Sequence, residues 1–531
     1  MSNLLKQRLR GKTIKIFGPP GTGKTENLLK RVQRYLKQGY SPDEICYISF
    51  TNKAVDECVS RVRKRFKEYD EDDFKYFRTL HSLARQQFAE IPVLDPKADL
   101  LMFHTQYGTV KVNYKDTWDD QKVYNNWSLQ IYDRARNMKV DPVWLYKQQS
   151  RKAVRLQQFK SIIAGYEEFK TMETENGGRT PDRLDFTDMV EKFINDGLTI
   201  PFKVLMVDEA QDLTPLQWDM VVKIAERVDR VYLAGDDDQA IYEWNGADVY
   251  YFQTFPGHEV VLKKSVRLNK NIHFFSKCLL NSMGDDRVKK EFYSNQKEGK
   301  IYRCSGLKKI PWHLEGSWMV LARINDVKKE LQIEAKNLGL YFQDVKNNKS
   351  FDPNQYLAIE YWTKICEGGS ISREEACTMY EYLLNIDHGF RSQDSKKWSF
   401  AHPNQVFTFD ELHLRCGMRD EKSSWDQVFK RKFKEKDKKY FKKLILPPNI
   451  IIDTIHQVKG GEADNVILSS KCNFPSHFEK KNLKEKVKEL RVWYTGATRS
   501  KNTLHLLSTY HQYHFPLGKY FNLYEANYGR V

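Results

Sequence analysis

A single glycine-rich run limits what this chain can fold into more than any other feature. Residues 18–25 read Gly-Pro-Pro-Gly-Thr-Gly-Lys-Thr and fit G-x-x-x-x-G-K-T without a mismatch. Residues 13–17 before the run alternate like a strand, and apolar residues after it recur at helical spacing as far as Gly39. Such a strand–helix turn wraps backbone N–H groups around phosphate oxygens, whereas a chance match to the pattern fits this setting poorly. The predicted phosphate-binding residues are Gly18, Pro19, Pro20, Gly21, Thr22, Gly23, Lys24 and Thr25.

Two side chains of this loop and two carboxylates elsewhere have the chemistry of nucleotide hydrolysis. The pattern assigns Lys24 to the β- and γ-phosphates and the Thr25 hydroxyl to Mg²⁺. The apolar run 204–207 ends in Asp208 and Glu209. We expect Asp208 to hold the metal ion and Glu209 to orient or deprotonate the attacking water. The alternative, a solvated acidic turn, does not explain why a buried strand leads directly into both carboxylates.

Another strand-like run, residues 231–234, leads into a second polar loop. Residues 235–247 hold three consecutive aspartates, then Gln239, and then the aromatic residues Tyr242 and Trp244. Gln239 is a candidate contact to the γ-phosphate, and Trp244 is a candidate stacking platform for a nucleic-acid base. Taken alone, Trp244 also fits a core residue, and both interpretations stay open at this point.

The composition fits a globular protein with a polyanionic partner. Of the 531 residues 40% are hydrophobic, 30% are charged and 13% are aromatic, and the formal net charge is +17. Aromatic rings stack on bases while Lys and Arg follow phosphates. No run approaches ~18 apolar residues, so we expect no membrane span, and the basic N-terminus lacks the apolar stretch of a signal peptide. The cysteines show no C-x-x-C spacing, which argues against a zinc site or a disulfide framework. We therefore expect a reducing compartment such as the cytoplasm.

Apolar runs that alternate with helical segments predict an α/β fold with parallel strands. Residues 90–183 and 350–447 lack such runs and have the largely helical, polar character of inserted domains. Residues 419–443 hold 11 Lys or Arg against 5 Asp or Glu, which fits either a solvated helix face or a surface for nucleic acid or a partner. For residues 479–490 we expect a solvated helix face. The predicted strands include 13–17, 45–50, 204–207, 231–234, 318–321 and 466–468.

The order of these motifs resembles that of the UvrD/Rep/PcrA family of superfamily 1 DNA helicases. Residues 48–54 (Ile-Ser-Phe-Thr-Asn-Lys-Ala) and 79–82 (Thr-Leu-His-Ser) are similar to two motifs on the DNA side of that family. Residues 208–212 and 235–247 match two further motifs, the latter highly characteristic of the family. The DNA contacts that the resemblance and the stacking argument give this half are Phe50, Asn52, His81 and Trp244.

The second half of the chain continues in the same order. Residues 265–267 (Ser-Val-Arg) stand where the family has Asn-Tyr-Arg, and residues 492–499 resemble the last motif. The resemblance implies that Arg267 and Arg499 reach the γ-phosphate, where guanidinium groups stabilise the charge of the transition state. Residues 454–462 resemble T-x-H-x-x-K-G-x-E. The resemblance puts Thr454, His456 and Lys459 on the DNA side, or between the two sites, and Glu462 near the ribose.

The resemblance also implies an architecture of two RecA-like motor lobes, each interrupted by a mainly helical insertion. Residues 185–188 resemble a short family element at the point where the first lobe resumes. The expected parts are the first lobe at 1–89 and 184–262, its insertion at 90–183, the second lobe at 263–349 and 448–531, and its insertion at 350–447.

The implied activity is Mg²⁺- and ATP-dependent movement along single-stranded DNA from 3′ to 5′, with separation of strands at single-strand/duplex junctions. Further partners would be replication or repair proteins, in the cytoplasm of a host cell if the gene is a phage gene. Two departures from the family pattern keep other nucleoside triphosphates open. Only 17 residues precede Gly18, with Gln7 at the wrong spacing for the family's glutamine motif, and Val266 replaces the aromatic residue that stacks on adenine.

Three other functions stay open. The first is a translocase that strips proteins from nucleic acid with little unwinding. The second is a helicase–nuclease subunit, against which we note that 32 residues follow Arg499, fewer than a nuclease domain needs. The third is a DNA-binding module with a decayed ATPase, which the presence of Lys24, Asp208, Glu209 and Gln239 argues against.

Overall fold

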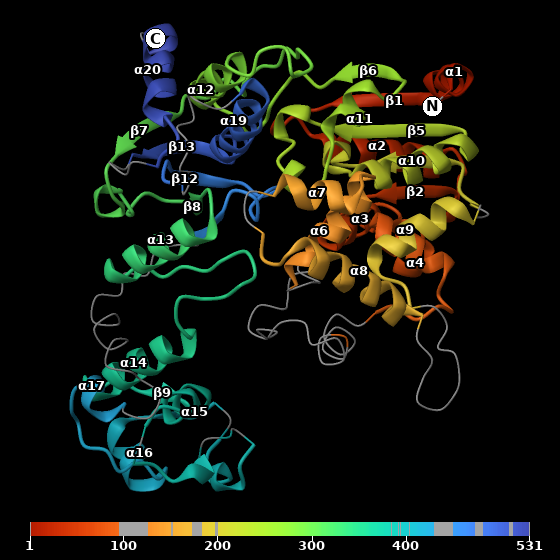
Figure 1. Ribbon diagram of the computed structural model, residues 1–531. Helices are drawn as coiled ribbons and strands as arrows, with labels where there is room; N and C mark the ends of the chain where they lie inside the picture. Colours follow the sequence, from red (N-terminus) through yellow and green to blue (C-terminus); the bar gives the residue numbers. More distant parts are fainter. Residues whose placement is uncertain are drawn as a thin grey trace. The chain divides into compact units, whose positions relative to one another are not determined.

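Two parallel β-sheets organise the chain (Figure 1). One lies in a unit within Met1–Gly299 and Lys481–Thr498, and the other in a unit within Lys300–Lys480 and Arg499–Arg530. The computed structural model describes residues 2–94, 103, 126–149, 152–171, 183–196, 200–383, 385–390, 392, 394–402, 404–429, 450–472, 482–508 and 513–529.

The sheet of the first unit has six strands in the order β3-β2-β4-β5-β1-β6, and all neighbouring pairs are parallel. The central strands are short apolar runs, as is typical of strands covered on both faces. Parallel strands point the same way, so their carboxyl ends lie along one edge. The strands are β1 (Thr13–Phe17), β2 (Ile45–Ile48), β3 (Phe77–Arg78), β4 (Val204–Val207), β5 (Arg230–Gly235) and β6 (His258–Val261).

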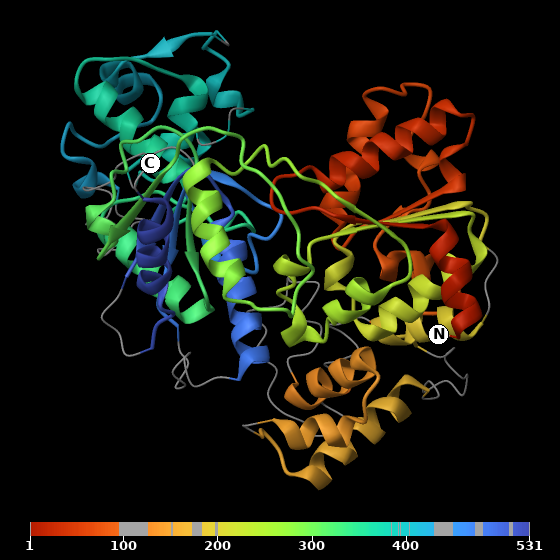
Figure 2. The ribbon, with the colours of Figure 1, turned by 90° about the horizontal axis from the view of Figure 1, so that it is seen from above.

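Helices cover both faces of this sheet (Figure 2). They include α1 (Asn3–Lys12), α2 (Lys24–Lys37), α3 (Asn52–Arg63), α4 (Leu80–Gln87), α9 (Phe186–Asn195), α10 (Pro215–Arg227) and α11 (Val249–Thr254). Side chains alternate along a strand, so Met206 and Tyr232 share a core with α2 and α3. Leu205 and Leu233 face the opposite core, which is closed by α1, α4, α9, α10 and α11.

A smaller helical core in the first unit is tied to α9 by ion pairs. Arg136 pairs with Asp185 at 2.9 Å, and Lys170 pairs with Asp188 at 2.8 Å. Asp185 and Asp188 also form a capping box at the start of α9, so these carboxylates fix that end of the helix. The helices of this core are α6 (Trp127–Met138), α7 (Pro142–Gln148) and α8 (Leu156–Lys170), and the first unit also contains α12 (Lys270–Asn281) and α19 (Leu483–Ala497).

The sheet of the second unit has five parallel strands in the order β11-β8-β12-β13-β7. Helix α13 (Asn325–Asn337) packs on this sheet, with Leu331 in one core with Val320 and Ile452. Helix α20 (Leu517–Tyr528) follows the last strand. The strands are β7 (Lys300–Cys304), β8 (Trp318–Ala322), β11 (Ile450–Thr454), β12 (Ala463–Ser469) and β13 (Ser500–Leu507).

Residues between 351 and 429 of the second unit form a core of their own. Trp362 and Trp398 are buried in it, and each indole N–H donates to a backbone carbonyl, Trp362 to Ser423 at 2.8 Å and Trp398 to Phe390 at 3.1 Å. Its elements are α14 (Pro353–Cys366), α15 (Arg373–Tyr380), α16 (Phe409–Arg415), α17 (Trp425–Val428) and the antiparallel pair β9 (Ile371–Ser372) and β10 (Val406–Phe407). Short 3₁₀ turns of the chain are η1 (Pro42–Glu44), η2 (Glu71–Asp73), η4 (Ala210–Asp212), η5 (Asp237–Gln239), η6 (Glu243–Asn245), η7 (Leu307–Lys309), η8 (His388–Phe390) and η9 (Lys396–Trp398).

The predicted α/β fold with parallel sheets is confirmed, and each apolar run named from the sequence forms a strand. Of the basic stretch 419–443, residues 430–443 lie outside the described residues, and its role stays a prediction. The expected solvated face of 479–490 is one side of α19 only, because Val487 and Leu490 are buried there. Among the described helices, none combines the length and apolarity that crossing a membrane requires. The division into two lobes and two insertions stays a prediction.

Candidate functional site

The predicted residues of the first unit gather where its strands end. Strand β1 runs into the loop Gly18–Thr25, β4 runs into Asp208, and β5 runs into Asp236. Strand β5 lies between β4 and β1, so these three loops are neighbours along the carboxyl edge of the sheet. That edge is where open parallel sheets bind ligands.

The phosphate loop is packed closely against residues 265–267. Gly21 has a φ of 71°, and a Cβ atom at this position would lie 2.4 Å from the Cβ of Arg267, so only glycine fits. The Ser265 hydroxyl donates to the carbonyl of Pro20 at 2.7 Å, and the Val266 N–H donates to the carbonyl of Gly21 at 2.9 Å. These bonds bring Arg267 beside the predicted phosphate loop.

A hydroxyl and a carboxylate meet at the start of α2. The Thr25 hydroxyl donates to Asp208 Oδ2 at 2.7 Å, and the Tyr47 hydroxyl donates to the same oxygen at 3.1 Å. Burial, and then the neighbouring Glu209 carboxylate, raise the pKa of Asp208 above its ordinary value. A divalent cation would favour the ionised form, and Mg²⁺ prefers oxygen ligands of this kind. Thr25 and Asp208 therefore fit the metal site predicted for them.

Glu209 is held in an unusual backbone conformation next to Lys24. Its φ of 52° lies in the left-handed region, which non-glycine residues adopt mainly where surrounding contacts impose it. Gln211 Nε2 donates to Glu209 Oε2 at 2.6 Å, while Lys24 Nζ lies 3.8 Å from Glu209 Oε1. Lys24 also donates to the carbonyl of Gly18 at 3.0 Å. The predicted general base and the predicted phosphate-binding ammonium thus lie together.

Gln239 joins this group through hydrogen bonds from the second polar loop. Its side-chain amide donates to Asp236 Oδ2 at 2.6 Å, and the Asp236 N–H donates to Gln211 Oε1 at 3.0 Å. Because Gln211 also holds Glu209, the chain of bonds runs from Gln239 to the carboxylate at the end of β4.

Three aromatic side chains form a row on the same unit. Phe50 stacks on Tyr242 with ring centroids 5.1 Å apart and planes 18° apart, and Tyr242 lies 6.4 Å from Trp244. Trp244 is 53% exposed, so its interpretation as a core residue is wrong. Asn52, the first residue of α3, is exposed as well. Phe50 and Tyr242 are partly exposed, and a row of rings that ends in an exposed one is typical of surfaces on which bases stack.

His81 lies at the start of α4, in contact with the ring of Phe186. The two ring centroids are 5.7 Å apart, in an edge-to-face arrangement. Burial lowers the pKa of His81 to about 4, so its imidazole is neutral near pH 7. A neutral imidazole can donate or accept a hydrogen bond but adds no charge, and its DNA contact stays a prediction.

The remaining predicted residues belong to the second unit. Thr454 is the last residue of β11, is buried, and its hydroxyl accepts from the Gln457 N–H at 3.4 Å. His456 and Lys459 are partly exposed in the turns that follow.

Arg499 and Glu462 of the same unit have partners there. Arg499 is buried and donates through Nη1 to the carbonyl of Gly461 at 3.1 Å. Glu462 pairs with Lys501 at 2.7 Å. Glu462 directly precedes β12 and Arg499 directly precedes β13, so these two predicted nucleotide residues lie at the starts of two neighbouring strands.

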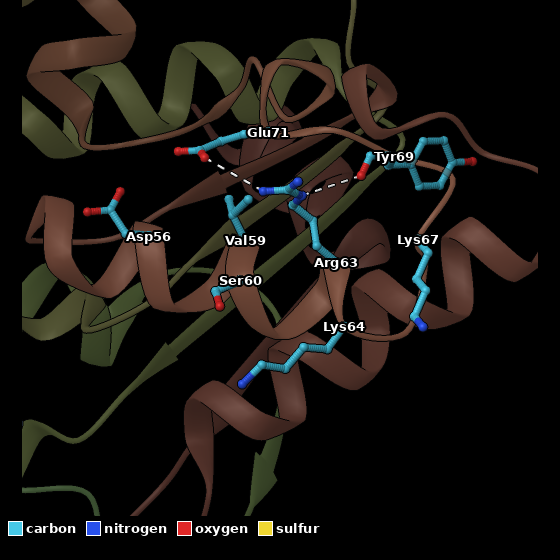
Figure 3. A pocket seen from close by; sticks show the side chains of 8 residues that line it. All are labelled: Asp56, Val59, Ser60, Arg63, Lys64, Lys67, Tyr69 and Glu71. Carbon is cyan, nitrogen blue, oxygen red and sulfur yellow. Dashed lines mark hydrogen bonds and ion pairs between the residues drawn. The ribbon is translucent and has the colours of Figure 1, made fainter. Parts of the chain in front are cut away.

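An open hollow of about 540 Å³ lies beside α3 and the segment that follows it (Figure 3). It contains none of the predicted site residues. Arg63 lies 3.7 Å from Glu71 and its Nε donates to the carbonyl of Tyr69 at 3.4 Å, so its charge is already paired. The lining residues are Asp56, Val59, Ser60, Arg63, Lys64, Lys67, Tyr69 and Glu71.

The sequence did not identify three groups that organise the site. Tyr47 and Gln211 hold the two carboxylates, and Lys290 pairs with the aspartates after β5. The run of three aspartates behind a buried strand signalled that a cation is needed, since unpaired buried carboxylates are costly. Nothing in the sequence indicated which cation supplies the pairing.

Comparisons with known proteins match both parts of the chain. The UvrD/REP helicase N-terminal domain matches residues 4–258, and the UvrD-like helicase C-terminal domain matches residues 421–512. A probable DNA helicase II homolog of Mycoplasma pneumoniae is 21% identical, over 94% of this chain and 82% of that protein.

Two further relatives carry the names of ATP-dependent DNA helicases. Rep of Buchnera aphidicola is 23% identical over 50% of this chain and 42% of its own length. PcrA of Staphylococcus aureus is 23% identical over 54% of this chain and 40% of its own length. The first matched segment contains the phosphate loop, Asp208 and Gln239, and the second contains the 454–462 loop and Arg499. The chain belongs to the UvrD-like helicases, the family of UvrD, Rep and PcrA.

Proposed function

We propose that this UvrD-like helicase hydrolyses ATP to move from 3′ to 5′ along single-stranded DNA and to separate duplex at junctions. The observation that carries the proposal is that one unit holds both the side chains suited to nucleotide hydrolysis and a row of aromatic rings. Thr25 and Asp208 bond at 2.7 Å with Lys24 and Glu209 beside them, and Phe50, Tyr242 and Trp244 form an aromatic row on the same unit. Nucleotide chemistry and base stacking are therefore supported within one rigid framework.

The roles of the side chains follow from the charge that develops during phosphoryl transfer. Lys24 and the backbone N–H groups of Gly18–Thr25 bind the phosphates, and Glu209 orients or deprotonates the attacking water. Gln239 contacts the γ-phosphate, while Arg267 and Arg499 stabilise the negative charge of the transition state. Thr25 and Asp208 would hold Mg²⁺, which when bound neutralises charge on the phosphate oxygens.

The DNA-side roles rest on groups that are exposed or partly exposed, apart from the buried Thr454. A base stacks on Trp244, beside the Phe50–Tyr242 pair. Asn52, His81, Thr454, His456 and Lys459 contribute polar contacts to the strand. Glu462 meets the ribose of the nucleotide. A net charge of +17 supports the approach of a polyanion.

The decisive experiment measures ATP hydrolysis and unwinding on duplexes with a 3′ tail, with a 5′ tail and with neither. We expect hydrolysis to rise with single-stranded DNA and unwinding to start from the 3′ tail. Lys24→Ala should lower kcat at least about 100-fold, because the loss of one preorganised charge typically costs that much. Lys64→Ala, which removes an exposed lysine from the hollow beside α3, should behave as wild type.

Equal unwinding from both tails would contradict the proposal. So would a rate of ATP hydrolysis that does not rise with single-stranded DNA. Displacement of a bound protein from the tail without unwinding would instead identify a translocase that clears DNA.

A further inference from the structure

Three consecutive aspartates are buried directly after β5. Asp236, Asp237 and Asp238 have no exposed surface, and a buried carboxylate is stable only when a cation or several donors satisfy it. The ammonium of Lys290 provides this, at 3.0 Å from Asp236 and 2.8 Å from Asp238, with a further contact to Asp237. The Lys290 side chain is itself fully buried. The three carboxylates lie close enough together to hold a metal ion, but Lys290 already contacts all three.

Two of the three aspartates have other strong partners. Arg287 donates two hydrogen bonds to the Asp238 carboxylate, from Nε at 2.7 Å and from Nη2 at 2.6 Å. Asp237 Oδ2 accepts from the Val288 N–H at 2.7 Å and from Gln253 Nε2 at 3.0 Å. Lys290 is therefore the cation in contact with Asp236, whose pKa burial raises and Lys290 lowers.

Asp236 is the point where this buried cluster meets the nucleotide site. Its Oδ2 atom accepts from Gln239 at 2.6 Å, and its N–H donates to Gln211, which in turn holds Glu209 at 2.6 Å. An unbroken series of contacts thus runs from Lys290 to the predicted γ-phosphate contact and to the predicted general base. Glu209 ends this series 3.8 Å from Lys24.

We propose that Lys290 is a positioning residue for ATP hydrolysis, which fixes Asp236 and through it the orientation of the Gln239 amide. This inference rests on the proposed function. Without the ammonium, Asp236 would be one of three buried carboxylates paired with a single arginine. It would then move or take up a proton, and either change removes the acceptor that orients Gln239. Misplacement of a catalytic group by about 1 Å costs up to ~100-fold in rate, so the effect should appear in kcat.

Removing Lys290 alone leaves three buried carboxylates with one cation, which destabilises the fold, so the test conserves the charge of the cluster. The wild-type cluster has three carboxylates and two cations, a net charge of −1. Lys290→Met combined with Asp237→Asn leaves two carboxylates and one cation, again −1. Asp237→Asn alone keeps the contacts between Lys290, Asp236 and Gln239 and is the matched control.

We expect the control to hydrolyse ATP as the wild type does, and the double variant to lose about tenfold to 100-fold in kcat with an unchanged KM for ATP. Thermal unfolding and binding of single-stranded DNA confirm that both variants are folded. Equal kcat values in the two variants would overturn the proposal. If the double variant does not fold, Lys290→Arg keeps the charge but changes the geometry, and an unchanged kcat in that variant would overturn it equally.

A second comparison separates positioning from a general structural role. In a Gln239→Ala background, the further loss caused by Lys290→Met with Asp237→Asn should disappear, because the residue through which Lys290 acts is gone. A loss of the same size in both backgrounds would refute action through Gln239. The wild-type assay reports on the proposed function separately. A wild type without DNA-stimulated hydrolysis refutes that function, whereas an active wild type with unaffected variants refutes only the role of Lys290.

Discussion

The two sheets both carry predicted nucleotide residues, but these residues are held in different ways. In the first unit, Thr25, Asp208 and Gln239 are bonded to other residues of the same site, and Asp208 and Gln239 are buried. In the second unit, Arg499 donates to a loop carbonyl and Glu462 pairs with a lysine at 2.7 Å, both within that unit. The first arrangement is fixed by strand ends that the sheet aligns. In the second, the proposed roles require each side chain to exchange its contact, with a carbonyl or with an ammonium, for a phosphate or a ribose.

This difference suggests a division of labour. A preorganised group binds nucleotide and metal at little cost, since its geometry is already set. A group that must exchange partners contributes mainly when the transition state offers it a stronger one.

Arg499→Ala should give the largest selective effect on the chemical step. A guanidinium on the transferring phosphoryl group is typically worth about 10³-fold or more in kcat. Because Arg499 bonds to Gly461 within its own unit, its removal should leave the affinity for ATP nearly unchanged. Steady-state hydrolysis and binding of a fluorescent ATP analogue measure the two effects. A loss of ATP affinity equal to the loss of kcat would show that the second unit contributes to ground-state binding and would contradict this division of labour.

Trp244→Ala should weaken binding of single-stranded DNA by about 1–3 kcal/mol, the usual range for a base stacked on an aromatic ring. Its ring is 53% exposed and belongs to the first unit, which also holds the predicted residues Thr25 and Asp208. Binding of ATP without DNA should be unchanged. The matched control is Trp144→Ala, since Trp144 is 49% exposed on α7. Equal effects of the two variants, measured by fluorescence anisotropy, would show that Trp244 is not a specific stacking platform.

The residues at the strand ends and Trp244 differ in how far the sequence predicts their positions. Strand ends were predictable, because an apolar run followed by Gly18 or Asp208 combines a buried strand with a polar loop. Parallel pairing then brings such loops together without any further information. The exposure of Trp244 was not predictable, because an aromatic residue after a polar loop, taken alone, fits a core residue better than an exposed one.

Long-range partners were even harder to predict from the sequence. Lys290 is separated from Asp236 by more than fifty positions, and no local pattern distinguishes it from the neighbouring Lys289, which is exposed. The left-handed backbone of Glu209 was equally hidden, because glutamate seldom adopts this conformation and no local pattern marks it. Tertiary contacts, and not local propensity, decide such details.

His505→Phe should make the stability of the second unit less sensitive to acid. His505 is buried between the rings of Trp318 and Tyr302, and burial lowers its pKa to about 4. In the unfolded chain the imidazole takes up a proton near pH 6.5. The folded state is therefore destabilised as the pH falls from about 6.5 towards 4, by about 2 kcal/mol at pH 5.

Urea unfolding at pH 7 and at pH 5 measures this effect. We expect the variant to lose less stability than the wild type between the two pH values, because phenylalanine keeps the ring contacts and binds no proton. His258→Gln changes an exposed histidine of the first unit and should leave the pH dependence as it is. An unchanged pH dependence in His505→Phe would mean that another group carries the acid sensitivity.

The smallest effect is expected from Lys501→Gln, which removes the ammonium that lies 2.7 Å from Glu462. The two side chains are 38% and 39% exposed, and an ion pair at such a position contributes roughly 0–1 kcal/mol to stability. If Glu462 exchanges Lys501 for the ribose, the variant should bind ATP slightly more tightly, with a KM lowered by about twofold, equivalent to ~0.4 kcal/mol. Glu462→Gln should raise the KM. Unchanged KM values in both variants would show that Glu462 does not contact the nucleotide. Arg499 would then stay as the predicted nucleotide contact of the second unit.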